Sequence, residues 1–275
     1  MSEQLPSVAI LGTGSMGGAI LQGLRQPGVE AASVRVTTRT DASAAGLRER
    51  GIEARATEHE HDANRWAVTD ARLVILGVKP AQITALLEEI AADLHPQALV
   101  VSVAAGITTS TMEAHITQSV VRAMPNTPAL IGRGVTGVSG GSRATAADLA
   151  LAAELFRTVG TVIELPESQI DALSTVSGSG PAYVFLLIEE LTRAAERLGF
   201  DESVAALMVQ QTFLGASLLL EAEGDDPAEL RRRVTSPKGT TERAVAVLQE
   251  AQLVDLFGRA TDAALARARE LAAGG

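Results

Sequence analysis

Three stretches of small and hydroxyl-bearing residues have a composition that suits ligand binding. They are Gly12 to Gly17, the run Ser177-Gly178-Ser179-Gly180-Pro181, and residues 234–241. Small side chains leave backbone N–H groups accessible, and the first N–H groups of a helix have no partner inside it, so such segments bind anionic groups. The alternative for each stretch is a plain helix start, in which the hydroxyls only cap the helix.

The first stretch has the spacing of a dinucleotide-binding turn. It reads Gly12-Thr13-Gly14-Ser15-Met16-Gly17. An apolar run at residues 8–11 precedes it, and a segment of helical periodicity follows. In this order of strand, turn and helix, Gly12 permits the tight turn, Gly14 lets the backbone approach a pyrophosphate, and Gly17 lets the helix pack on the strand. The alternative is a tight turn without a ligand.

The end of the next expected strand indicates which nicotinamide cofactor binds. Residues 34–37 form this strand, and Thr38, Arg39 and Thr40 follow it. Enzymes selective for the unphosphorylated cofactor usually place Asp or Glu here, whereas Arg accommodates the 2′-phosphate. Asp41 falls later, where we interpret it as the cap of a helix that begins at residue 42. We therefore predict NADPH, with NADH as an option; the alternative for Arg39 is a solvated side chain.

Two continuous apolar runs, residues 73–78 and 99–103, predict parallel strands buried on both faces. Lys79-Pro80 ends the first run, and Ala104-Ala105-Gly106 ends the second. Ligands bind beyond the carboxyl ends of parallel strands, so both strand ends should lie at the same edge of the sheet as Gly12. Lys79 either lines the mouth of that site or, if it is buried, acts in acid-base chemistry.

Further strands complete a doubly wound α/β sheet. Residues 119–122 lead into the loop Met124-Pro125-Asn126-Thr127-Pro128, which two prolines stiffen. Strands at 134–138 and 161–165 follow, with a helix at 144–156 between them. We expect this sheet domain to span residues 1–165.

The second half of the chain, residues 166–275, is predicted to be helical throughout. A helix should begin at Ser177 to Pro181 and stop at Gly199, and further helices are expected at 204–221, 228–234, 241–249 and 254–271. Several of these helices are apolar around much of their circumference, which requires burial on more than one side. A partner subunit is the economical explanation, and the junction between the two domains is a favoured position for a ligand.

Composition excludes several classes of protein. The 275 residues suffice for two domains, and the net charge of −10 argues against binding nucleic acid or an anionic membrane. The absence of cysteine excludes disulfides and thiolate chemistry. His59 and His61 lie in a polar segment without a carboxylate framework, so we expect no metal. No signal segment or uninterrupted membrane-length apolar run is found, which favours a cytoplasmic protein and a small-molecule ligand.

Taken together, these motifs resemble pyrroline-5-carboxylate reductases over essentially the whole chain. The matching segments are the glycine turn, residues 77–80, 122–128, Asp171 through Tyr183, Gln211-Thr212, and residues 235–241. The resemblance implies a Rossmann-like cofactor domain, a helical dimerisation domain, and reduction of 1-pyrroline-5-carboxylate to L-proline, the final step of proline biosynthesis. It also implies homodimers, which in this family commonly assemble into decamers.

The resemblance also implies site residues. The predicted cofactor-binding residues, to which Arg39 is added from the argument above, are Gly12, Thr13, Gly14, Ser15, Met16, Gly17, Thr38, Arg39, Asn64, Val78, Lys79, Pro80, Ala104, Ala105, Met124 and Asn126. The predicted substrate-binding residues are Glu167, Ser177, Gly178, Ser179, Gly180, Gly239, Thr240 and Thr241, with Thr241 as the catalytic residue. Two positions depart from the family, because Lys238 replaces a usual glycine and Arg233 replaces an asparagine often close to the cofactor.

The expected chemistry suits the residues available. A cyclic imine accepts hydride at its C=N carbon once its nitrogen is protonated in water, so the protein mainly aligns cofactor and substrate. The four histidines are scattered, and no acid-base or nucleophile set can be assembled from them. Two other classes remain as alternatives. A β-hydroxyacid dehydrogenase would place a lysine on the helix at 183–198, which has none, and a non-catalytic NADP-binding regulator could lack the later hydroxyl stretches.

Overall fold

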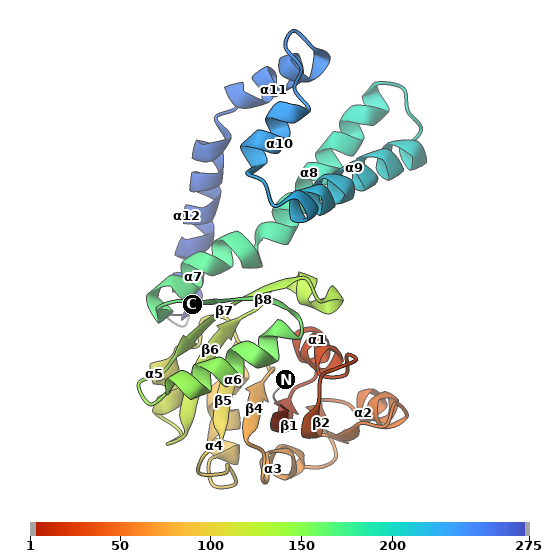
Figure 1. Ribbon diagram of the computed structural model, residues 1–275. Helices are drawn as coiled ribbons and strands as arrows, with labels where there is room; N and C mark the ends of the chain where they lie inside the picture. Colours follow the sequence, from red (N-terminus) through yellow and green to blue (C-terminus); the bar gives the residue numbers. More distant parts are fainter. Residues whose placement is uncertain (1–3, 273–275) are drawn as a thin grey trace. The chain divides into compact units, whose positions relative to one another are not determined.

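The computed structural model describes residues 4–272 and divides the chain into two compact units. The first unit ends at Ser179, and the second spans Gly180–Ala263; from Ala264 the chain is grouped with the first unit. The three residues at each end of the chain lie outside the described residues, so the outermost parts of both predicted domains are not covered. Figure 1 shows a sheet with helices in one unit and helices alone in the other.

The first unit contains an eight-stranded sheet in the order β3-β2-β1-β4-β5-β6-β7-β8. Neighbouring strands pair in parallel except β6 and β7, which are antiparallel. The strands are β1 (Leu5–Leu11), β2 (Ala31–Thr38), β3 (Glu53–Ala56), β4 (Leu73–Leu76), β5 (Leu99–Ser102), β6 (Ser119–Met124), β7 (Gly134–Gly140) and β8 (Gly160–Glu164). The predicted doubly wound α/β sheet is confirmed, whereas β3 and the antiparallel pair were not predicted.

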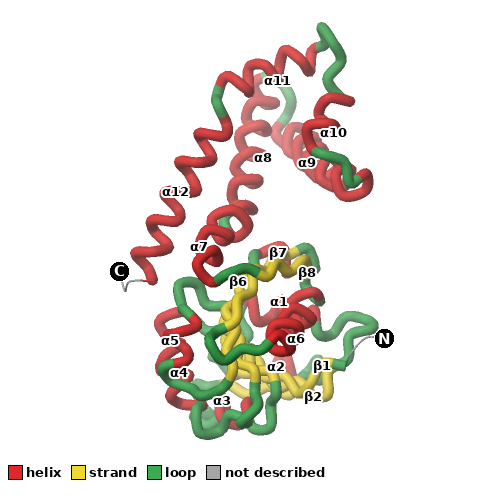
Figure 2. Tube along the Cα trace, turned by 60° about the vertical axis from the view of Figure 1, so that its left-hand side comes forward, coloured by secondary structure: helices red, strands yellow, loops and turns green. Residues whose placement is uncertain are grey.

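Helices cover both faces of this sheet, as Figure 2 shows in red around the yellow strands. The α-helices are α1 (Ser15–Gly23), α2 (Asp41–Arg48), α3 (Ala63–Val68), α4 (Ile83–Ile90), α5 (Thr109–Glu113), α6 (Ala146–Arg157) and α7 (Ile170–Leu173). The 3-10 turns are η1 (Pro80–Gln82), η2 (Thr127–Ile131) and η3 (Glu167–Gln169), and a π-helical turn, η4 (Ser174–Gly178), follows α7.

Alternation along the strands produces two hydrophobic clusters. Successive side chains of a strand point to opposite faces, so Ile10 and Ile75 join one cluster while Leu11 and Val74 join the other. Every residue of β4 and β5 is buried. This is why both strands read as continuous apolar runs, and it fixes the strand ends that carry the site.

Two predicted helix starts of the first unit are shifted in the structure. Thr40, not Asp41, is the N-cap of α2, and its hydroxyl accepts a hydrogen bond from the Ser43 N–H. Asp41 is the first helical residue instead, where a negative charge is favourable. The helix predicted at 144–156 begins at Ala146, because Thr145 and Asp148 cap each other's backbone reciprocally.

The second unit consists of helices that expose much of their apolar surface. They are α8 (Gly180–Arg197), α9 (Glu202–Glu223), α10 (Pro227–Arg233), α11 (Thr240–Glu250) and α12 (Leu253–Ala272), the last of which continues beyond Ala263. Within the described part of this unit the buried hydrophobic residues are Ala195, Ala205 and Val209, while side chains such as Phe185 and Leu207 are more than half exposed. The helix stop predicted at Gly199 is confirmed by its φ of +97°.

Among the described helices, α9 has the length and apolar character of a membrane span. Gln210, Gln211 and Thr212 interrupt its apolar residues. Length and composition alone do not distinguish such a helix from one covered by another protein surface.

Candidate functional site

A cavity of about 760 Å³ lies at the carboxyl ends of β1, β2 and β4. Of the residues predicted to bind the cofactor, those that line the cavity are Gly12, Thr13, Gly14, Thr38, Arg39, Asn64, Val78 and Lys79. The other predicted cofactor residues are not part of its lining, namely Ser15, Met16, Gly17, Pro80, Ala104, Ala105, Met124 and Asn126. The cavity therefore gathers the glycine turn, the end of β2 and the end of β4, as parallel strand ends require.

The three glycines of the turn differ in what surrounds them. Gly12 has a φ of +86°, and a Cβ there would lie 2.8 Å from Cγ1 of Val78. A Cβ on Gly17 would lie 2.6 Å from the carbonyl oxygen of Gly12, whereas Gly14 faces open space. Gly14 is also the N-cap of α1, and no side chain caps this helix. The first N–H groups of α1 are therefore left for a ligand beside an unobstructed backbone.

Thr37 anchors the glycine turn from the neighbouring strand. Its backbone oxygen accepts hydrogen bonds from the Thr13 N–H and hydroxyl, both at 2.8 Å. Its hydroxyl accepts from the Gly12 N–H at 3.2 Å and donates to Oδ1 of Asn64 at 2.9 Å. The amide of Asn64 in turn donates to Glu89 at 3.1 Å. Thr37 and Glu89 could not be predicted as site residues, because contacts between residues so far apart in the chain leave no local pattern.

The residues that line the cavity at the end of β2 offer an anion-binding surface, and none of them is a carboxylate. Arg39 is exposed and lines the cavity with Thr38, Thr40 and Ser43. Within residues 4–272 no ion pair involving the Arg39 guanidinium is found. Asp41 is engaged elsewhere, because its carboxylate accepts a hydrogen bond from Arg48 at 2.9 Å. The arrangement supports a phosphate group near Arg39.

Lys79 is exposed at the cavity. Of the two roles considered from the sequence, acid-base chemistry requires burial of this side chain, and the structure shows none. Lys79 thus lies at the mouth of the cavity, where its charge attracts an anionic ligand. Pro80 occupies the first position of the short helix η1 that follows.

Ser177 to Gly180 lie where α7 passes through the π-helical turn into α8. The predicted helix beginning is confirmed at Gly180, but the preceding residues are already helical, and the Ser179 N–H donates to the Ser174 carbonyl at 2.9 Å. Expecting open amides throughout this stretch was therefore wrong for Ser179. Asn126 secures the turn, because its amide nitrogen donates to the Ser177 carbonyl at 2.9 Å and its oxygen accepts from the Val135 N–H.

Glu167 lies in a partly buried polar cluster of the first unit. Its carboxylate accepts from the N–H and hydroxyl of Thr109 at 2.7 and 2.6 Å and lies 3.7 Å from Arg122. Arg122 is 3% exposed and also forms an ion pair with Asp171. These contacts tie β6, α5 and α7 together, so the oxygens of Glu167 already have partners within the chain.

The start of α11, in the second unit, is an uncapped helix N-terminus. Gly239 is the N-cap, and no side-chain hydrogen bond caps the helix. Thr241 is exposed at the second helical position, and no hydrogen bond of its hydroxyl is found among the described residues. Lys238 just before it has a φ of 59°, and its N–H donates to Glu242 at 2.9 Å. The alternative that Thr241 serves as the helix cap is therefore wrong.

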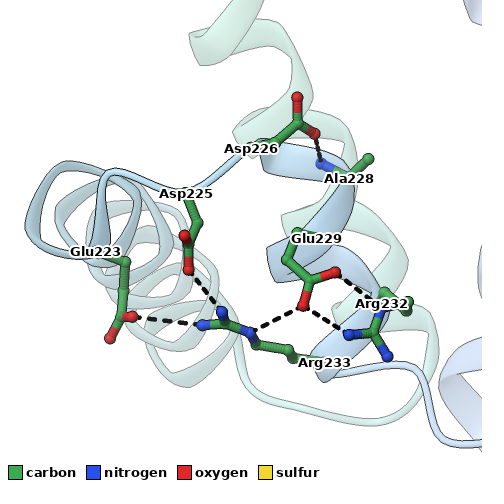
Figure 3. A network of polar contacts seen from close by, with 7 residues as sticks. All are labelled: Glu223, Asp225, Asp226, Ala228, Glu229, Arg232 and Arg233. Carbon is green, nitrogen blue, oxygen red and sulfur yellow. Dashed lines mark hydrogen bonds and ion pairs between the residues drawn. The ribbon is translucent and has the colours of Figure 1, made fainter.

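Arg233 is committed to carboxylates in the second unit, as Figure 3 shows. Its guanidinium lies 3.3 Å from Glu223, 2.6 Å from Asp225 and 3.2 Å from Glu229. Attraction to Asp225, followed by the hydrogen bond to Glu229, raises the pKa of Arg233. This position, often an asparagine near the cofactor in the family, here joins the end of α9 to α10.

The histidine pair considered as a metal site carries no metal-binding arrangement. His59 and His61 are both exposed. No group of three or more histidine, aspartate or glutamate side chains suited to holding a metal ion occurs among residues 4–272.

Family models and known proteins match this chain over most of its length. Residues 167–271 match the family model described as pyrroline-5-carboxylate reductase dimerisation, and residues 7–106 match that of an NADP oxidoreductase, coenzyme F420-dependent. The pyrroline-5-carboxylate reductase of Pseudomonas aeruginosa is 42% identical over 97% of both chains. That of Corynebacterium melassecola is 38% identical over 97% of this chain and 99% of its own.

Solved structures agree with these relatives. A pyrroline-5-carboxylate reductase from Coxiella burnetii superposes with a TM-score of 0.89 at 37% identity, covering 96% of this chain and 97% of its own. A Plasmodium falciparum pyrroline carboxylate reductase with NADP bound shares the fold, with a TM-score of 0.80 at 21% identity and 99% coverage of both chains. On the identity and coverage of these relatives, the chain belongs to the pyrroline-5-carboxylate reductase family and is a homo-oligomeric oxidoreductase.

Proposed function

We propose that this chain reduces 1-pyrroline-5-carboxylate to L-proline with NADPH, using the cavity of the first unit for the cofactor and the start of α11 for the substrate carboxylate. The observation that carries the proposal is that α1 and α11 both begin without a side-chain cap. An uncapped helix start offers N–H groups and a partial positive charge to an anion. The cofactor pyrophosphate and the substrate carboxylate are the two anions that the reaction must hold.

The cofactor half is supported by the lining of the cavity. The pyrophosphate meets the open backbone at Gly14, and Arg39 with the hydroxyls around it receives the 2′-phosphate. Bound nicotinamide supplies the hydride. For Ala104, Ala105, Met124 and Asn126, which lie at the ends of β5 and β6, we propose contacts toward the nicotinamide end.

The substrate half centres on Thr241. Its exposed hydroxyl and the N–H groups of Thr240 and Thr241 form the proposed carboxylate site, with Gly239 beside them although its own N–H already donates to the Ser236 carbonyl at 3.0 Å. Ser177 to Gly180 are proposed separately as further substrate-binding residues. For Glu167 the contacts with Thr109 and Arg122 favour a role in holding this end of the first unit. The domain boundary between residues 165 and 166 stays a proposal: the dimerisation family model begins at residue 167, which supports it, whereas the first compact unit continues to Ser179.

The chain's own task is alignment. The imine nitrogen is already protonated in water, hydride adds to the C=N carbon, and the electron pair of the π bond goes to nitrogen, giving the secondary amine. No general acid is required, in agreement with the lack of a buried acid-base pair in the cavity lining. Carboxylate binding at Thr241 orients the ring.

The assembly that we propose is a dimer through the apolar helices of the second unit, with decamers built from such dimers. The exposed Phe185 and Leu207 and the apolar face of α9 support a protein partner for these helices. We also propose a cytoplasmic location, where NADPH and the imine are present.

Turnover of defined substrates tests the function. We expect NADPH oxidation with 1-pyrroline-5-carboxylate. We expect none with the carbonyl compounds that β-hydroxyacid dehydrogenases form from their substrates and reduce in the reverse direction. Tight NADPH binding without imine turnover would favour the non-catalytic regulator instead. A failure to bind either nicotinamide cofactor would overturn the assignment of the cavity.

A further inference from the structure

We propose that Glu89 is a positioning residue for the cofactor, because its charge fixes the direction of a hydrogen-bond relay that ends at the glycine turn. The relay runs from Glu89 on α4 through Asn64 on α3 and Thr37 on β2 to the N–H of Gly12. All four residues line the cavity. The inference rests on one part of the proposed function, namely that the cavity binds a dinucleotide.

The direction of the relay follows from what each group can donate. An ionised carboxylate only accepts, so Glu89 holds the amide nitrogen of Asn64, at 3.1 Å. The amide oxygen then faces Thr37, whose hydroxyl donates to it at 2.9 Å. With its hydrogen committed in this way, the Thr37 oxygen is free to accept the N–H of Gly12.

Reversing the Asn64 amide would leave a buried group without a partner. The amide nitrogen would then face the Thr37 hydroxyl, and the hydroxyl hydrogen would lose its acceptor. Thr37 is 1% exposed, so water cannot replace that acceptor. A carboxamide at position 89 would accept either orientation of Asn64, so only the Thr37 end of the relay would still select between them.

The relay matters for the turn because Thr37 holds both residues that shape it. The Gly12 N–H is shared between the hydroxyl and the backbone oxygen of Thr37, each at 3.2 Å, and Thr13 donates to the same backbone oxygen. Gly12 also has the left-handed φ that directs the chain toward the cofactor. The relay also commits one N–H of Asn64 to Glu89, which leaves the second N–H as its remaining donor for a cofactor oxygen.

Because Glu89 is charged, the direction in which its substitution changes the Kd for NADPH tests the proposal. A carboxylate in the wall of a cavity for a polyanion repels the phosphates, so a change to glutamine should tighten NADPH binding if charge alone mattered. If the relay matters, the same change should weaken binding. We expect Glu89→Gln to raise the Kd for NADPH about five- to tenfold, with the KM for the imine and kcat at saturating NADPH unchanged.

The control is Glu88→Gln, which removes the same charge from the adjacent position of α4, outside the cavity lining. Its Kd should match that of the unchanged protein. In an Asn64→Ala background, Glu89→Gln should have no further effect, because the relay is already interrupted. The melting temperature of each variant shows whether folding is affected.

Two results would overturn the inference. One is that the Glu89→Gln protein binds NADPH as tightly as the unchanged protein, or more tightly. The other is a full additional loss in the Asn64→Ala background, which would place the effect outside the relay. If the unchanged protein itself fails to bind NADPH, the proposed function fails instead, and the two failures are thereby distinguished.

Discussion

The two units of this chain bury their apolar residues in opposite ways. In the first unit β4 and β5 are buried along their whole length between two hydrophobic clusters. In the second unit α9 is the most apolar helix, yet of its residues only Ala205 and Val209 are buried in the described structure. The first unit has a core within one chain, whereas the second requires another surface. In the first unit the residues of the glycine turn are held by hydrogen bonds within the chain, whereas the second unit leaves its apolar side chains for an assembly partner.

The contrast is tested most strongly by placing a charge on the apolar surface of the second unit. Leu207 is 62% exposed, and we expect Leu207→Glu to convert the oligomer to smaller species. Burial of a leucine contributes about 2 kcal/mol and occurs twice in a two-fold interface, so dissociation should be favoured by roughly a thousandfold. Light scattering measures the mass.

A matched control comes from the first unit. Ile131 is 77% exposed, and Ile131→Glu should leave the mass unchanged if association is confined to the second unit. Equal dissociation by both changes would show that exposed apolar residues of either unit contribute, which would contradict the contrast.

A second test addresses the internal contacts of the first unit. Asp171→Ala removes an ion-pair partner of Arg122, which is 3% exposed and has an unpartnered Nε. The buried guanidinium loses one of its two carboxylate partners, with Glu167 remaining at 3.7 Å, and Asp171 is 29% exposed, so we expect a loss of about 2 kcal/mol in the free energy of unfolding, measured with urea. Asp41→Ala, which breaks an exposed pair with Arg48, should cost less than about 1 kcal/mol. Similar losses in both variants would argue against this role for Arg122.

The start of α11 offers a test of function in the second unit. Thr241→Ala should lower kcat/KM for 1-pyrroline-5-carboxylate about tenfold to a hundredfold, because a hydrogen bond to a charged group is lost. The NADPH affinity should stay the same, since the cofactor cavity lies in the first unit. The melting temperature should also be unchanged, because Gly239 and not Thr241 is the N-cap. Unchanged imine kinetics would remove Thr241 from the substrate site.

Cofactor preference tests the rim of the first unit's cavity. Arg39→Asp places a carboxylate where the end of β2 has none, so the ratio of kcat/KM for NADPH to that for NADH should fall by about tenfold or more. Arg48→Asp is a suitable control, because Arg48 lies on α2 outside the cavity lining. A preference for NADH in the unchanged enzyme would contradict the role assigned to Arg39.

Strong local signals allowed much of the first unit to be predicted. The continuous apolar runs gave β4 and β5, and the glycine spacing gave the turn whose Gly12 and Gly17 prove to be sterically required. β3 was missed because Glu53 and Arg55 alternate with small residues in a four-residue strand. The antiparallel direction of β7 was missed because strand direction leaves no mark on composition.

Contacts between distant residues set the limit for the site. Thr37, Asn64 and Glu89 meet only in the folded chain, so their relay has no sequence pattern. Arg233 looked like a departure at a cofactor contact, and only its three carboxylate partners show what it does. The start of α11 was predictable because small and hydroxyl residues mark it locally.

The smallest expected effect concerns two threonines within the same sheet of the first unit. Thr136 on β7 is fully buried, and its hydroxyl has no hydrogen-bond partner in the described structure, whereas the equally buried Thr37 uses its hydroxyl to donate and to accept. A buried hydroxyl without a partner is unfavourable, and valine has nearly the same shape. Thr136→Val should therefore stabilise the protein by about 1 kcal/mol in urea unfolding.

Thr37→Val provides the opposite case. It removes the donor to Asn64 and one of the two Thr37 oxygens that accept from the Gly12 N–H, leaving the backbone oxygen at 3.2 Å. We therefore expect a loss of about 1–3 kcal/mol in the free energy of unfolding together with weaker NADPH binding. The two substitutions change the same atoms at similar burial, so a difference in sign isolates the hydrogen bonds from the change in shape. If Thr136→Val destabilises the protein as much as Thr37→Val does, the hydroxyl of Thr136 has a bonding role in solution. The buried hydroxyl on β7 would then be hydrogen-bonded, as the hydroxyl of Thr37 is at the cofactor cavity.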